Sequence, residues 1–217
     1  MASSTQLRLA SLFDSTWDFT LYGEGFLALQ GETTRYISVD RLIKQPTTDP
    51  AYVSVVEYVA TVSKGGSFGA GRVTPPILVT MLERDAHEAL RLVKNIDTSG
   101  NASLMYEVAD VKTWANLGLH LAEQLRGAVA LQTYRLGGGE QHQREAIVHL
   151  QRALQYWDEV IRITRPIYRD MPLTHYNGNS RDANDDNLFH WARIRGEVAR
   201  DVDIARAKRL EPPTPAL

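Results

Sequence analysis

The segment ADVKTWANLGLHLAEQLRGAVAL, residues 109–131, carries the pattern that decides the fold. It contains no proline, and its small and apolar residues belong to a longer series with alternating spacings of four and three positions. Such heptad spacing is typical of a long helix that packs along a seam against another helix. The series consists of Leu104, Val108, Val111, Ala115, Gly118, Ala122, Leu125 and Val129.

A second series follows LGGGE (residues 136–140), a glycine-rich break that ends a helix. Its spacings alternate between three and four, so we expect two helices of about 30 residues, joined by a tight hairpin and packed antiparallel. The second series consists of Ile147, Leu150, Leu154, Trp157, Ile161, Thr164 and Tyr168.

Helices are also predicted on both sides of this hairpin. Thr74 followed by Pro75 and Pro76 is typical of a helix start, because the first turn needs no N–H groups at those positions. A last helix is expected from a cap at Asn184 or Asp185 to about residue 209. Four long helices between about residues 75 and 210 predict an all-α fold, an antiparallel helical bundle.

The first 74 residues give weaker signals. The capping box SSTQ (residues 3–6) opens an N-terminal helical arm that we expect to reach about residue 29. Residues 31–74 are compatible with short strands or short helices, and extended or irregular structure is expected there. Residues 1–74 are therefore expected to pack on the bundle of residues 75–217, within one structural domain.

The composition of the chain argues against several classes of partner and of chemistry. A net charge of −2 over 217 residues, with scattered Lys and Arg, argues against nucleic acid as a main partner. No apolar run approaches the roughly 18 residues of a membrane span, and the N-terminal segment lacks the basic and apolar regions of a signal peptide. Because there is no cysteine, disulfides, thiolate nucleophiles and cysteine-ligated zinc are excluded. The compartment stays open.

Two loops suggest ligand chemistry, but each lacks required residues. KGGSFGAGRVT (residues 64–74) has the glycine spacing of a phosphate-binding loop, but Arg72 and Val73 stand where that loop needs Lys and Ser or Thr. DANDDN (residues 182–187) opens like a calcium loop and lacks its glycine and its closing glutamate. A flexible loop and a helix cap are the expected roles.

Acidic residues on the predicted helices are candidate metal ligands and candidate catalytic acids. Two Glu–His pairs are spaced four apart, unlike the Glu-x-x-His motif of di-iron bundles, and are expected to be solvated. Asp85 and Asp203 lie near inner helix faces, where an ion pair with an arginine such as Arg195 or Arg206 is expected. No metal, no cofactor and no catalytic set is predicted. The pairs are Glu83–His87 and Glu145–His149.

The polar stretch MPLTHYNGNSRDANDDNLFHW (residues 171–191) is the candidate binding site. It predicts a loop of about 15 residues, longer than the usual 2 to 8 between antiparallel helices. An exposed Trp191 beside polar side chains could stack on a sugar ring, whereas the alternative is a polar hairpin whose aromatic side chains anchor it to the bundle. The predicted contact residues are His175, Tyr176, Asn177, Asp182, His190 and Trp191.

Four segments resemble the C-terminal helical region of α-glucuronidase-like glycoside hydrolases. They are WDFTLYGEGFLA (residues 17–28), TPPILVTMLERDAHEAL (residues 74–90), residues 109–131 and HLQRALQYWDEVIRITRPIY (residues 149–168). The resemblance implies a helical domain that packs on a (β/α)8 barrel and often mediates dimerisation. Since the catalytic carboxylates of that family lie on the barrel, no catalytic residue is carried over to this chain.

The sequence therefore predicts a non-catalytic accessory or interaction domain of a carbohydrate-active protein. Its expected partners are a catalytic barrel of the same or a neighbouring protein, a carbohydrate and a second copy of the chain. A periplasmic or secreted location is expected if the parent protein degrades polysaccharides. The alternatives are a structural dimerisation module and a metal-dependent helical-bundle enzyme that uses Asp85, His87 or His190.

Overall fold

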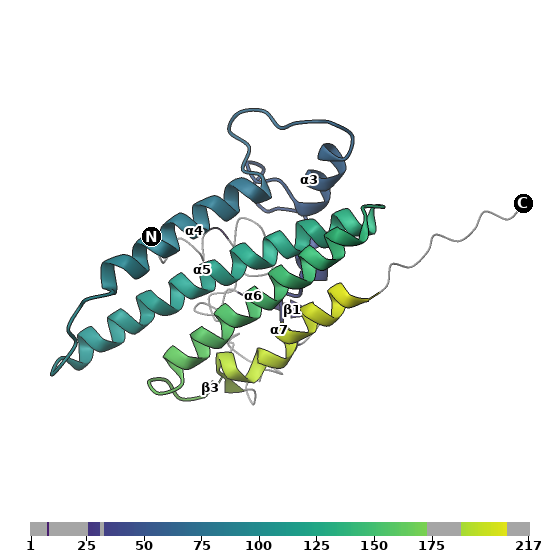
Figure 1. The fold of residues 1–217 in the computed structure, drawn as a ribbon. Coiled ribbons are helices and arrows are strands. Elements are labelled where there is room, and N and C mark those ends of the chain that lie inside the picture. Colours follow the sequence, from purple (N-terminus) through teal and green to yellow (C-terminus); the bar gives the residue numbers. More distant parts are fainter. Residues whose placement is uncertain (1–7, 9–25, 31–32, 173–187, 208–217) are drawn as a thin grey trace, which may run out of the picture.

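The computed structural model of the protein describes residues 8, 26–30, 33–172 and 188–207. Helices dominate the described residues, which confirms the all-α prediction. Four long helices lie side by side along a common direction (Figure 1). They are α4 (Pro75–Val93), α5 (Ala102–Arg135), α6 (Glu140–Thr164) and α7 (Trp191–Arg206).

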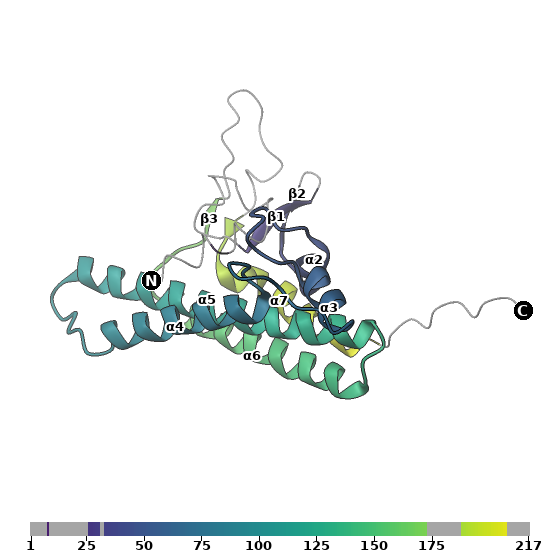
Figure 2. The same cartoon turned by 90° about the horizontal axis from the view of Figure 1, so that it is seen from above.

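Helix α5 forms the centre of the molecule. It packs along both α4 and α6, and the short helices α2 (Val39–Lys44) and α3 (Val55–Val62) cover another of its faces (Figure 2). Between residues 113 and 131, only Trp114, Arg126 and Val129 are not fully buried. The heptad series therefore describes only part of the buried surface, because α5 is enclosed on several sides rather than along one seam.

Local chemistry explains the ends of α5. At its start, the Asn101 side chain accepts a hydrogen bond from the Leu104 N–H at 2.9 Å, which satisfies one of the free donors of the first turn. At its end, Gly137 adopts a φ of 104°, a conformation that residues with a Cβ rarely enter. The chain reverses over residues 136–139, and α6 runs back along α5 (Figure 1).

The N-terminal region differs from the expectation in two places. Residues 27–29, the end of the predicted helical arm, belong to strand β1 (Leu27–Gln30), which pairs antiparallel with β2 (Thr33–Tyr36). Within residues 31–74, β2 is extended as expected, but helices α2 and α3 form where extended or irregular structure was expected, because Ser38 and Ser54 cap them through their side chains. The rest of the predicted arm, apart from residues 8 and 26, lies outside the described residues.

The predicted start of the last helix is wrong. Strand β3 (Met171–Pro172) pairs antiparallel with β4 (Leu188–Phe189), and α7 begins only at Trp191. The His190 side chain supplies the cap by accepting a hydrogen bond from the Ala192 N–H at 3.0 Å. Asn184 and Asp185, the expected caps, lie outside the described residues.

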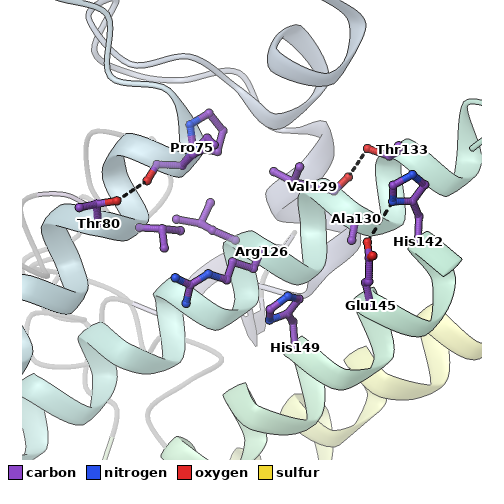
Figure 3. Close-up of a pocket in the computed structure, with 12 residues that line it drawn as sticks. Pro75, Thr80, Arg126, Val129, Ala130, Thr133, His142, Glu145 and His149 are labelled. Carbon is purple, nitrogen blue, oxygen red and sulfur yellow. Dashed lines mark hydrogen bonds and ion pairs between the residues drawn. The ribbon is translucent and has the colours of Figure 1, made fainter. Parts of the chain in front are cut away.

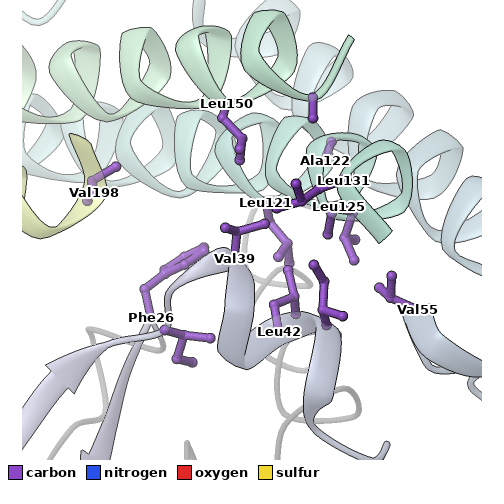
Figure 4. Close-up of a cluster of buried hydrophobic side chains, with 14 of the residues drawn as sticks. Phe26, Val39, Leu42, Val55, Leu121, Ala122, Leu125, Leu131, Leu150 and Val198 are labelled. Carbon is purple, nitrogen blue, oxygen red and sulfur yellow. The ribbon is translucent and has the colours of Figure 1, made fainter. Parts of the chain in front are cut away.

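One apolar core joins the N-terminal elements to the bundle. It runs from Phe26 through α2 and α3 to all four long helices and ends at Ala205 in α7. Figure 4 shows Val39 and Leu42 beside Leu121 of α5 in this core. Burial of apolar surface thus connects segments that are far apart in the sequence.

Candidate functional site

The predicted loop site is only partly visible. His175, Tyr176, Asn177 and Asp182 lie outside the described residues, whereas His190 and Trp191 can be placed. His190 is 1% exposed and caps α7, and burial, the first of several causes, lowers its pKa. Its ring therefore stabilises the helix start and is shielded from solvent.

Trp191 packs against the bundle. Its ring meets that of Phe189 edge to face at 5.3 Å between centroids, and it lies against the apolar core. Its carbonyl accepts a hydrogen bond from the Trp157 Nε1–H at 3.0 Å. These contacts give Trp191 an anchoring role at the first residue of α7, whereas the sequence had placed it about one turn inside the helix.

A buried polar network joins the N-terminal region to α5 and α7. The Tyr36 hydroxyl lies 2.9 Å from His120 Nε2, 2.8 Å from Gln124 Nε2 and 3.4 Å from Asp201 Oδ2. Gln124 also donates to the Ile37 carbonyl at 2.8 Å and to Asp201 at 3.0 Å. These contacts satisfy polar side chains that the core would otherwise leave without partners.

Two further backbone contacts complete the network. Asp201 accepts a hydrogen bond from the Val39 N–H at 2.8 Å, and His120 Nδ1 lies 2.9 Å from the Ala153 carbonyl. Because a carbonyl only accepts, Nδ1 of the neutral ring carries the proton, which leaves Nε2 as an acceptor that faces the Tyr36 hydroxyl.

Burial shifts the pKa values within this network. It raises the pKa of Asp201 to about 7, against hydrogen bonds from Val39, Gln124 and Tyr36 that lower it. It lowers the pKa of His120 to about 4 and raises that of Tyr36 well above its ordinary value. Shifted pKa values often mark active sites, but these side chains are at most 2% exposed and face each other. The arrangement favours a structural role.

An open groove lies elsewhere, between the start of α4, the second half of α5 and the first half of α6 (Figure 3). Its volume is about 490 Å³, and apolar side chains of α4 and α5 provide most of its floor. Polar groups from all three helices line its rim. The apolar lining consists of Pro75, Pro76, Val79, Leu125, Val129 and Ala130, and the polar lining of Thr80, Arg126, Thr133, His142, Glu145 and His149.

A chain of charged groups crosses from α4 to α6 beside the groove. Arg126 donates two hydrogen bonds to Glu83, at 2.5 and 2.8 Å, and one to Glu123 at 2.8 Å. Glu123 accepts a further hydrogen bond from His149 Nδ1 at 2.7 Å. Burial raises the pKa of Glu123, but His149 and Arg126 outweigh it and the pKa is lowered, so Glu123 is a carboxylate.

A second histidine of the groove is held in the same way. His142 Nδ1 lies 3.0 Å from Glu145 Oε2, one turn along α6. Since a carboxylate only accepts, the neutral forms of His142 and His149 carry their proton on Nδ1. Their Nε2 atoms make no hydrogen bond with the described part of the chain and are acceptors. The groove thus presents two oriented imidazoles above an apolar floor.

The ion pairs expected for Asp85 and Asp203 both form, one of them with other partners. Asp85 pairs with Arg8 at 2.6 Å and with Arg84, neither of which was expected. Asp203 pairs with Arg206, one of the two expected arginines, but it is exposed, so its predicted inner position is wrong.

The pairs Glu83–His87 and Glu145–His149 do not form, because both glutamates have other partners. Glu83 binds Arg126, Glu145 binds His142, and His149 binds Glu123. Among the described residues, no group of three or more His, Asp or Glu side chains could hold a metal ion.

Glu123, Arg126 and His142 were missed in the sequence. Glu123 and Arg126 could have been found from the polar residues that interrupt the apolar run of α5 in HLAEQLR (residues 120–126). In a helix enclosed by its neighbours, each such polar group needs a partner. Their partners on α4 and α6 follow only from the packing of the three helices.

Comparison with protein family models, curated proteins and solved structures finds no match for the chain. Nothing in these comparisons links it to α-glucuronidase-like domains. Of the helices in the described residues, none is long and apolar enough to cross a bilayer.

Proposed function

We propose that the chain is a non-catalytic accessory domain of a carbohydrate-active protein, and that the groove between α4, α5 and α6 is its binding surface. The groove itself carries the binding role, because it combines an apolar floor with a few oriented polar groups. Small-molecule sites in proteins have this composition. The carbohydrate context comes from the resemblance of four segments to the C-terminal region of α-glucuronidase-like hydrolases.

The buried network supports a non-catalytic role for the core. Tyr36, His120 and Asp201 have strongly shifted pKa values, yet each faces another member of the network or a backbone group. Their side chains are at most 2% exposed, so a substrate would have to open the core to reach them. These groups hold α5, α7 and the N-terminal region together.

Contacts with a catalytic barrel and with a second copy of the chain belong to the same proposal. The loop residues His175, Tyr176, Asn177 and Asp182 stay a prediction for such contacts. His190 and Trp191 are already used in holding the start of α7. Light scattering of the purified chain, alone and mixed with a candidate barrel protein, measures both associations.

Titration calorimetry with neutral and uronic-acid oligosaccharides tests the binding role. Thr80 is exposed on the groove, so Thr80→Trp fills it, and Gln151→Trp puts the same side chain on an exposed position of α6 outside it. We expect Thr80→Trp to weaken binding at least about tenfold, which corresponds to about 1.4 kcal/mol, and Gln151→Trp to leave it unchanged. Equal binding by both variants would remove the groove from the proposal, and no binding by the wild type would remove the carbohydrate.

A proton-transfer enzyme is the second candidate, favoured by Glu123 and His149. The carboxylate holds the imidazole so that its Nε2, on the groove, can take a proton from a bound group. Catalytic turnover that is lost in His149→Gln and kept in His87→Gln would make this the better proposal, since His87 is exposed outside the groove.

A further inference from the structure

We infer that the groove between α4, α5 and α6 recognises an organic cation, a primary ammonium group carried on an aliphatic body. The inference deepens the binding role proposed above and rests on the groove being a ligand site. It goes beyond that role by naming the charge and hydrogen-bonding chemistry of the ligand. Three observations on the same helices carry it.

The first observation is the balance of charges. Three carboxylates, those of Glu83, Glu123 and Glu145, lie in or beside the groove with one guanidinium, that of Arg126. While His142 and His149 are neutral, these groups leave an excess of two negative charges. Arg144, which precedes Glu145 on α6, is paired with Glu140, and Arg152, farther along the helix, offsets one of the two negative charges. A cation is the ligand that this balance favours.

The pKa of the Tyr156 phenol also indicates an excess of negative charge. Tyr156 lies on α6, and its pKa is raised first by burial and then by the charges of Glu123 and Glu83. Arg152 and Arg126 act in the opposite direction, and their effects are smaller. At Tyr156, the carboxylates therefore act more strongly than the guanidinium groups.

The second observation is that the rim offers acceptors rather than donors. His142 and His149 donate their Nδ1 protons to glutamates, which leaves Nε2 as an acceptor on each ring. Thr80 and Thr133 donate their hydroxyl protons to the Pro76 and Val129 carbonyls, so their oxygens also accept. An ammonium group has three donors and no acceptor, which matches this rim.

The third observation is the apolar floor. Pro76 and Val129 are the more exposed of the apolar residues that line the groove, and their surfaces can pack against methylene groups of a ligand. A ligand with both an aliphatic body and a cationic end therefore uses the whole groove. A carboxylate or phosphate ligand would meet repulsion from Glu145, and three of the five N–H groups of Arg126 already bind Glu83 and Glu123.

A matched series of three ligands tests the inference in calorimetric titrations of the full chain at about pH 8. The series is 1,6-diaminohexane, the neutral 1,6-hexanediol and the anionic adipate, which share one aliphatic body. We expect the diamine to bind at least about tenfold more tightly than the diol, and adipate not to bind, because one good charge-assisted hydrogen bond is worth about that factor. Binding of adipate as tight as that of the diamine would overturn the inference.

A matched pair of variants locates the binding. Glu145→Gln removes a carboxylate of the groove, while Glu140→Gln removes one from the exposed start of the same helix. We expect a loss of about fivefold or more in the first variant only. Equal diamine affinities in the two variants would show that the diamine does not bind in this groove.

Two further ligands separate this inference from the proposed function. A glucosamine trimer, titrated at about pH 7, tells whether the ammonium group belongs to an amino sugar, and spermidine tells whether it belongs to a polyamine. Thr80→Trp should block whichever ligand binds. If the variant abolishes the binding of neutral oligosaccharides while diamines never bind, the groove is a ligand site and the ammonium inference is wrong. If diamines bind and no saccharide does, the inference stands and the carbohydrate context is wrong.

Discussion

At the scale of single residues, Asp201 and His120 lie in one buried network and have pKa values shifted in opposite directions. The pKa of the Asp201 carboxyl rises to about 7 and that of the His120 imidazole falls to about 4, in both cases because burial disfavours the charged form. Both groups contact the Tyr36 hydroxyl, so one polar core holds a carboxyl and an imidazole that both prefer to be neutral.

These shifts have opposite effects on stability. The folded pKa of Asp201 exceeds its ordinary value of 3.8, so the stability contributed by the protonated form is lost as the pH rises from about 4 to about 7. The folded pKa of His120 is below its ordinary value of 6.5, so stability is lost as the pH falls from about 6.5 to about 4. Between about pH 4 and 6.5 the two contributions cancel.

Single substitutions should reveal how each of the two groups makes stability depend on pH. In His120→Gln, the free energy of unfolding should fall relative to the wild type as the pH rises from about 4.5 to about 7, and in Asp201→Asn it should rise. Each change should amount to a few kcal/mol, since one pKa unit corresponds to about 1.4 kcal/mol. Urea denaturation at both pH values measures it. Variants that follow the wild type in parallel would show that neither group titrates abnormally.

Part of this network could be predicted from the sequence. His120, Glu123 and Gln124 interrupt an apolar helical run, which indicates that each has a partner. Their partners could not be predicted, because Tyr36 and Asp201 are separated by 165 residues and meet only when the N-terminal region and α7 pack on α5. Asp203 was expected near the inner face, but the helix turns Asp201 inward instead.

At the scale of elements, the contact between α5 and α6 depends on a glycine. A Cβ added at Gly127 would lie 2.7 Å from Leu150 Cγ, closer than packed atoms approach. At this position, Leu150 of α6 occupies the space that a side chain on α5 would need. Gly196 in α7 is the opposite case, since a Cβ added there meets nothing within 4 Å.

The same substitution should have opposite effects at these two positions. Gly127→Ala should destabilise the protein by about 1–3 kcal/mol, because the new methyl group overpacks the contact with Leu150. Gly196→Ala should stabilise it by about 0.5–1 kcal/mol, because alanine favours the helix at an exposed position. Thermal unfolding of both variants followed by circular dichroism measures the two signs. A stabilised Gly127→Ala would mean that α6 moves away from α5 at little cost.

Helix starts were predicted well where the cap followed common rules. Thr74 with two prolines correctly marks the first residue of α4. The start of α7 could not be predicted in this way, because the cap is His190, a residue outside the usual capping set, and the pairing of β3 with β4 delays the helix. Ser38 and Ser54 are ordinary caps, but the short helices after them are too brief to show a clear period.

At the scale of the whole molecule, one core connects residues from Phe26 to Ala205. The Phe26 ring lies 5.1 Å from that of His120 and 5.8 Å from that of Trp157, so the N-terminal region packs directly against α5 and α6. Elements that share a core lose their buried surface together, which favours a single unfolding transition.

The protein should therefore unfold as one unit, and Phe26→Ala should weaken all of it. We expect a loss of about 3–5 kcal/mol, the usual cost of truncating a buried Phe. Helix signal in the far ultraviolet and tryptophan fluorescence should follow the same curve in the wild type and in the variant. Met105→Ala, on the exposed part of α5, is the control and should have little effect. Two separate transitions would show that the N-terminal region is an independent unit.

The enclosure of α5 also affects isotope exchange with solvent. The amide hydrogens of residues 113–131 lie in a helix that other elements surround, so local opening of one neighbour leaves most of them protected. In heavy water these amides should exchange last, at a rate set by opening of the entire molecule. Amides of the first two turns of α5, where the side chains are largely exposed, should exchange earlier. Exchange measured along this single helix would thus show where the interior of the protein begins.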